Sequence, residues 1–141
     1  VFPFAATGAA QRLRFSPNEK SRGMSKVDAE GPLFVEGRSL LDLVAEAGAP
    51  RLDAMKIDIE GHEFLTLAAF FRDAPGTLWP RLLLLETQHE DPVASAKSLA
   101  VATGYTKLLQ TKRNFVASFN DDSQRASWKT GETGRVRRRR L

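Results

Sequence analysis

The feature that most constrains the fold is the uninterrupted apolar run Leu82-Leu83-Leu84-Leu85. A strand with one face in water alternates apolar and polar side chains, and this run has no such alternation. It is therefore typical of a strand that is covered on both faces, as in the interior of a parallel sheet. We expect this run to be a central strand.

Extended and helical patterns alternate on both sides of that run. The sequence predicts strands at residues 12–15, 33–36, 52–59, 82–85, 105–110 and 115–119. It predicts helices after the N-cap Ser39, over residues 63–72, and after Asp91 and Pro92. The last two strands are joined by a short polar turn, which predicts a hairpin. We therefore expect a doubly wound α/β fold with a mostly parallel sheet and a terminal antiparallel hairpin strand.

The length of the chain leaves room for one domain. With 141 residues, of which 42% are hydrophobic, it can bury a single modest core. We expect residues 1–119 to form a partial domain and residues 120–141 to be a disordered basic tail. Because a full Rossmann-like sheet generally needs more chain, and because Val1 is not a methionine, we expect the carboxyl-terminal half of such a domain.

The composition also excludes several classes of protein and site. No stretch approaches the roughly 18 apolar residues that a membrane-spanning helix requires, and the first residues show no basic stretch followed by an apolar run and a small-residue cleavage site. Cysteine is absent, which excludes disulfides, thiolate nucleophiles and thiolate zinc sites. We expect a soluble, cytoplasmic protein whose oligomeric state stays open.

The net charge of +4 comes from the end of the chain. Five arginines lie there with no acid among them: Arg135, Arg137, Arg138, Arg139 and Arg140. Without them the remaining 16 basic and 17 acidic residues nearly cancel. The body also lacks interleaved aromatic and basic residues, so a nucleic-acid partner is not expected beyond this tail.

Ionisable residues gather where the predicted strand 52–59 ends. Lys56, Asp58 and Glu60 share one face of it, because side chains alternate with period two. Gly61 then allows a tight turn that brings the next helix N-terminus close to a ligand. Burying unpaired charges is costly. The cluster is therefore either a working site or a support in which Lys56 neutralises Asp58 and Glu60 caps the helix.

A second polar segment follows the leucine run and contains Glu86 and His89. The carboxyl ends of parallel strands meet at one edge of a sheet, where ligands bind. We therefore expect Asp58, Glu60 and Glu86 to emerge side by side and face a shared ligand cleft. His62 and His89 are further candidate bases, because an ordinary histidine titrates near neutral pH.

These residues also carry a family resemblance. The motif Lys56-Ile57-Asp58-Ile59-Glu60-Gly61, with Leu83-Leu84-Leu85-Glu86 after the next helix, resembles strands four and five of the FkbM family of S-adenosylmethionine-dependent methyltransferases. Upstream, Ser39-Leu40-Leu41-Asp42-Leu43 resembles the segment that precedes them, and a looser likeness extends over residues 4–119. The chain departs from the family at its beginning, where the glycine-rich cofactor loop has no counterpart.

The resemblance implies a Rossmann-like class I methyltransferase fold and methyl transfer to oxygen, often a hydroxyl of a small molecule or sugar. It implies S-adenosylmethionine as cofactor, with Asp58 beside its methionine moiety as a cofactor-binding and catalytic residue. Glu60 is implied as catalytic base or substrate anchor. Glu86 and His89 are the expected substrate-binding residues, with Glu86 orienting the acceptor from the neighbouring strand.

Three alternatives stay open. The first is a divalent metal site on Asp58, Glu60, Glu86 and His89, although the spacing matches no dedicated ligand motif. The second is a non-catalytic binding module whose arginine-rich tail recognises nucleic acid or acidic surfaces. The third is an inactive fragment whose open sheet edge invites association.

Overall fold

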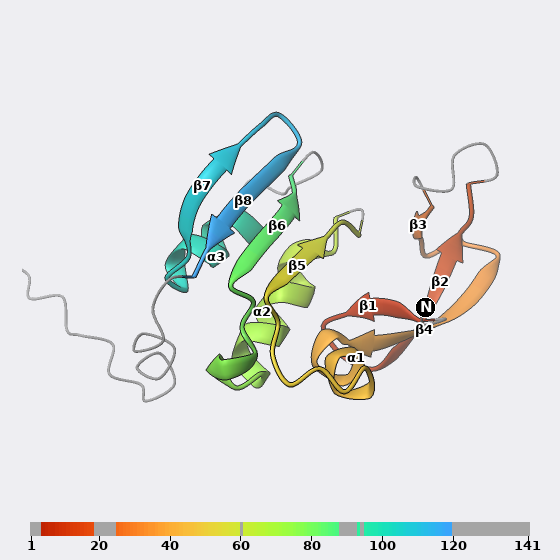
Figure 1. Ribbon diagram of the computed structural model, residues 1–141. Coiled ribbons are helices and arrows are strands. Elements are labelled where there is room, and N and C mark those ends of the chain that lie inside the picture. The colour runs from red at the N-terminus through yellow and green to blue at the C-terminus, as the bar shows by residue number, and fades with distance from the viewer. Residues whose placement is uncertain (1–3, 19–24, 60, 88–92, 94, 120–141) are drawn as a thin grey trace, which may run out of the picture.

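The computed structural model describes residues 4–18, 25–59, 61–87, 93 and 95–119, whose strands form two mixed sheets (Figure 1). The first sheet has the order β1-β4-β2-β3, from strands Ala5–Thr7, Leu33–Ser39, Gln11–Ser16 and Lys26–Val27. The second has the order β5-β6-β8-β7, from strands Ala54–Ile57, Leu82–Glu86, Asn114–Ser118 and Thr106–Gln110. The described helices are α1 (Leu40–Glu46), α2 (Glu63–Asp73), α3 (Ala96–Ala102) and the 3-10 helix η2 (Gly76–Leu78).

The predicted Rossmann-like, mostly parallel sheet is wrong. Among the described strand pairs, β1–β4 and β5–β6 are parallel and the other four are antiparallel. The reversed strand β8 also lies between β6 and β7, not at the edge of the sheet. The tight turn makes β8 antiparallel to β7, and burial of Phe115 and Ala117 draws it inward against β6. The fold is α/β with two mixed sheets.

The second sheet is also not doubly wound. Helices α2 and α3 pack against each other on one face of it (Figure 1). Parallel crossovers are right-handed, so β5-α2-β6 and β6-α3-β7, which advance in the same direction, place both helices on one side. The leucine run had predicted that β6 is covered on both faces, and this prediction is wrong. Leu83 and Leu85 are buried, whereas Leu82 and Leu84, on the other face, are only half-buried.

The hydrophobic core lies between this sheet and its two helices. An aromatic cluster ties the helical layer to the strand ends, with ring centroids 4.7 Å apart for Phe71 and Trp79 and 5.0 Å apart for Tyr105 and Phe119. The Tyr105 hydroxyl donates a hydrogen bond of 2.8 Å to the carbonyl of Pro80. This buried bond joins the segment before β6 to the start of β7.

Several local predictions are confirmed. Ser39 is the N-cap of α1, and its hydroxyl accepts the backbone N–H of Asp42 at 3.1 Å. Helix α2 matches the predicted helix to within one residue at its end, and β7 and β8 form the predicted hairpin. The third helix differs, because α3 begins at Ala96 with Ser95 as its N-cap. Asp91 and Pro92, its predicted start, lie outside the described residues.

The first sheet was predicted only in part. The strand at 12–15 lies within β2 and the strand at 33–36 within β4, and these two pair antiparallel. At Gly31 a Cβ atom would come within 2.5 Å of the Phe15 backbone, so the approach of the two segments requires glycine. The arginine-rich tail, predicted as disordered, falls outside the described part of the chain. None of the described helices is long and apolar enough to cross a membrane.

Candidate functional site

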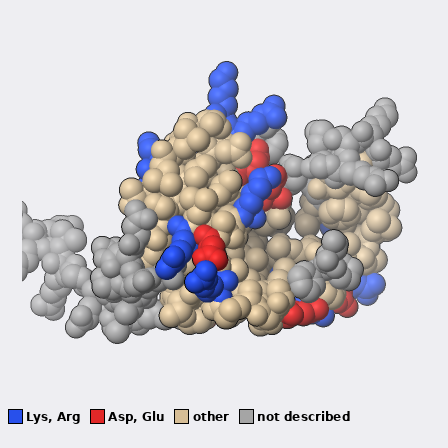
Figure 2. Space-filling model, viewed as in Figure 1, with Lys and Arg blue, Asp and Glu red and all other residues tan. Residues whose placement is uncertain are grey.

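Strands β5 and β6 bring two carboxylates to the end of the second sheet where both strands have their carboxyl ends. They pair in parallel, and Ile57 lies opposite Leu85 at the end of the shared register. Both of these side chains are buried, so Asp58 and Glu86, each one residue further on, belong to the opposite face. Figure 2 shows acidic and basic side chains gathered beside the ends of these two strands. Asp58 and Glu86 therefore follow neighbouring positions at the ends of the two paired strands.

Lys56 joins this group through an ion pair. Its Nζ atom lies 2.7 Å from Oδ2 of Asp58. The hydrogen bond with Asp58 and the charge of Asp58 raise the pKa of Lys56 above its usual 10.5; desolvation opposes them, and the charge of Glu86 adds a still weaker increase. Lys56 is therefore a cation throughout the physiological range. Its pairing with Asp58 agrees with the second interpretation of the cluster, in which Lys56 neutralises Asp58 and the charges support the fold.

The environment of the cluster differs from the one expected. From the sequence we expected these charges on an interior strand, where their burial would be costly. In the described sheet β5 is an edge strand, and the side chains of Lys56 and Asp58 are 59% and 39% exposed. Water solvates both groups, so the cost of burying a charge no longer argues for a function here.

Glu63, which the sequence argument did not single out, organises the turn after β5. Its side chain is buried although it is ionisable, and its two oxygens accept backbone hydrogen bonds from Ile59 at 2.9 Å and from Gly61 at 3.0 Å. Gly61 has a φ of 94°, which a side chain would strain. The sequence did contain a signal for this role of Glu63: a carboxylate at the first position of a helix, shortly after a glycine, is suited to accept backbone hydrogen bonds of the turn.

The other predicted site residues have different outcomes. Glu86 ends β6 and lies opposite Asn114 of β8, half-buried. His62 is the N-cap residue of α2, where its side chain makes no capping hydrogen bond. Glu60 and His89 lie outside the described residues. The structure thus places Asp58 and Glu86 after neighbouring residues of two paired strands, with Lys56 paired to Asp58, and the hollow found among the described residues lies elsewhere, on the first sheet.

A metal centre receives no support from the described side chains. Within that part of the chain, no three or more histidines, aspartates or glutamates are placed to hold an ion together. Two of the four residues named for such a site, Glu60 and His89, are not described.

Comparison with known proteins finds no relative of this chain. No protein-family model, curated protein or solved structure matches the chain. Lys56, Asp58 and Glu86 form what we call the strand-end cluster, and this cluster is the candidate functional site.

Proposed function

We propose that this chain contributes to S-adenosylmethionine-dependent methyl transfer to a hydroxyl group of a small molecule or sugar. The observation that carries the proposal is the strand-end cluster, in which Asp58 and Glu86 follow paired residues of two adjacent parallel strands. The resemblance of the sequences around these two residues to FkbM methyltransferases supports the same assignment.

The charges of the cluster fit the methionine end of the cofactor. S-adenosylmethionine supplies an electrophilic methyl group on a positively charged sulfur, beside an α-amino group and a carboxylate. Asp58 complements the two positive charges, and Lys56, held as a cation, complements the carboxylate. The exposure of both side chains leaves them accessible to a ligand. The sequence offers no glycine-rich loop for the adenosine part, so we expect weak binding, with a dissociation constant on the order of 1 mM.

Glu86 provides the second element of the proposal. Its carboxylate accepts a hydrogen bond from the acceptor hydroxyl, which orients the oxygen, and it holds the proton that this oxygen gives up. Glu60 and His89 keep their proposed roles as base or substrate anchor and as a substrate-binding residue. Glu63 supports the cluster from the side, because it fixes the turn that follows Asp58.

The proposal is tested by titrating the chain with S-adenosylmethionine and with S-adenosylhomocysteine while recording backbone amide NMR spectra. We expect saturable shifts at Lys56, Asp58 and Glu86. Asp58→Asn should weaken the binding of S-adenosylmethionine about tenfold, because one charge-assisted contact is lost.

Asp53→Asn is the matched control. Asp53 is likewise exposed and paired with a cation, Arg51, at 3.3 Å, but it precedes β5. The control should bind the cofactor like the unaltered chain. A folded chain that shows no shifts with either compound, or equal weakening in both variants, would reject the methyl-transfer proposal.

A further inference from the structure

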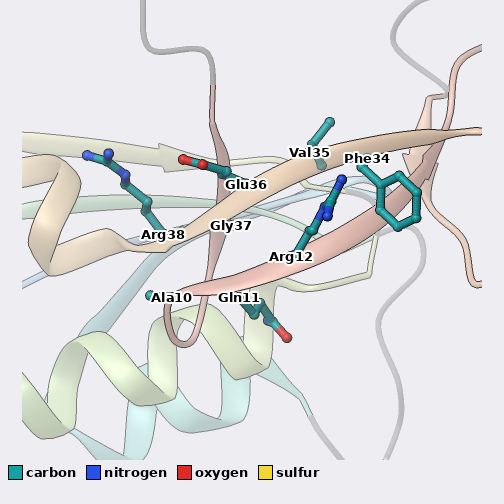
Figure 3. A pocket seen from close by; sticks show the side chains of 8 residues that line it. All are labelled: Ala10, Gln11, Arg12, Phe34, Val35, Glu36, Gly37 and Arg38. Atoms are coloured by element: carbon teal, nitrogen blue, oxygen red, sulfur yellow. The ribbon is translucent and has the colours of Figure 1, made fainter.

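A hollow of about 550 Å³ lies on the first sheet, away from the strand-end cluster. It is lined by residues of β2 and β4 together with the residue before β2, and the lining includes Gln11, Arg12, Phe34, Glu36 and Arg38 (Figure 3). In that view Arg12 reaches toward the ring of Phe34, while Gln11 points to the other side of its strand. The hollow therefore has an arginine and an aromatic ring side by side at one end.

Two guanidinium groups are stacked on Phe34. The guanidinium carbon of Arg12 lies 4.2 Å from the ring centroid and that of Arg14 lies 4.8 Å from it. Such cation–π contacts hold the flat face of a guanidinium and leave its N–H edge free to donate. The two residues share one face of β2, so two like charges are concentrated on an exposed ring.

No carboxylate neutralises these two arginines within the described part of the chain. Arg12 lies opposite Glu36 in the strand register, yet these two residues form no ion pair within 4.0 Å. Stacking on Phe34 takes the guanidinium away from this cross-strand acid. Arg14 donates one hydrogen bond of 3.3 Å to the carbonyl of Gly31, which anchors it and leaves further donors.

The remaining charged residues of the hollow have different roles. Arg38 is neutralised by Glu46 at 2.6 Å, and its guanidinium carbon lies 3.7 Å from the centroid of the Phe4 ring. Glu36 is exposed and contributes an acceptor for hydrogen bonds. The hollow thus has Arg12 at one end and the acceptor Glu36 beside it, and Arg14, which does not line the hollow, lies next to Arg12 over the ring of Phe34.

We propose that this hollow binds the phosphate ester of a polyol, such as a sugar phosphate. The phosphate oxygens accept from the guanidinium edges of Arg12 and Arg14, a geometry that suits the arginine fork. The hydroxyl groups donate to Glu36, whose negative charge opposes the binding of phosphate alone. The site stands apart from the proposed methyl transfer, since it uses no residue of the strand-end cluster.

The experiment is a titration of the full chain with glucose 6-phosphate as probe, followed by the Nε–Hε NMR signals of arginine. Separate titrations with inorganic phosphate and with glucose show which part of the probe is recognised. We expect glucose 6-phosphate to shift the Arg12 and Arg14 signals and to bind more tightly than inorganic phosphate, with no saturable effect of glucose. Arg12→Gln should weaken binding of the probe about tenfold. Arg12→Lys, which keeps the charge and loses the fork, should give an intermediate loss.

Two matched variants make the test specific. Arg113→Gln removes an exposed arginine from the turn before β8 and should leave binding unchanged, with the basic tail present in every variant. Glu36→Gln should bind inorganic phosphate at least as tightly and lose much of the preference for the sugar phosphate. Absence of shifts at Arg12 and Arg14, or equal weakening by Arg113→Gln, would overturn the proposal.

Discussion

Glu63 shows how one buried acid can be accommodated without a cation. A carboxylate removed from water requires hydrogen-bond donors in place of the lost solvation, and the turn before α2 supplies two backbone N–H groups. The same two bonds fix the turn that begins beside Asp58. The residue therefore connects the local stability of the turn to the geometry of the strand-end cluster.

Replacing Glu63 should destabilise the fold more than replacing an exposed acid. Glu63→Ala leaves the N–H groups of Ile59 and Gly61 without their acceptors and should lower the free energy of unfolding by about 2–3 kcal/mol, measured by urea denaturation. Glu63→Gln keeps one carbonyl acceptor and should cost less. The control Glu46→Ala removes a half-exposed partner of Arg38 and should cost less than about 1 kcal/mol. Equal losses for the two alanine variants would contradict this role.

At the scale of elements, the order of the second sheet leaves β7 at an edge. Every residue of this strand is exposed, including Leu108 and Leu109 at 58% and 56%. A register irregularity between Lys107 and Leu109 interrupts its pairing with β8. An edge strand with unpaired backbone groups and apolar side chains is a surface on which chains associate.

A charge on this edge should reduce self-association. Leu109→Lys should lower the concentration-dependent increase in sedimentation coefficient, because lysine on an edge strand opposes pairing with a second strand. Val101→Lys is the matched control: Val101 is similarly exposed, at 52%, but lies on α3. If both variants sediment like the unaltered chain, association does not use the β7 edge.

At the scale of the whole molecule, the buried apolar residues are unevenly distributed. The core cluster comes entirely from residues 44–119, and the first sheet contributes no member to it among the described residues. This sheet contacts the helices through β1 and β4, and also at Gly8, directly after β1, where a Cβ atom would lie 3.2 Å from the carbonyl oxygen of Leu65 in α2. Backbone hydrogen bonds and cation–π contacts therefore contribute a larger share of the stability of the first sheet than of the second.

The two sheets should consequently differ in local stability. Amide hydrogen exchange followed by mass spectrometry should be faster in β2 and β4 than in β6 and β8, by on the order of tenfold or more, because regions with few buried apolar contacts open more readily. Uniform protection across both sheets would show that the molecule opens only as one cooperative unit.

For the candidate site, the sequence predicted the residues better than their surroundings. It identified Asp58 and Glu86 as neighbours at strand ends, because period-two alternation and the order of elements are local information. It did not predict that Lys56 and Asp58 would be solvated, since that depends on which elements cover the strand. Glu63 was missed because its importance depends on the path of the turn.

Local sequence patterns were enough to predict several of the elements: the cap at Ser39, the helical spacing over α2 and the hairpin of β7 and β8 follow from interactions within a few residues. The arrangement of these elements depends on packing between segments that are far apart in the chain. The leucine run of β6 fits a strand covered on both faces, and the packing of α2 and α3 on one side left its second face half-buried. Strand order and coverage depend on contacts between distant segments, and a local pattern of side chains does not encode them.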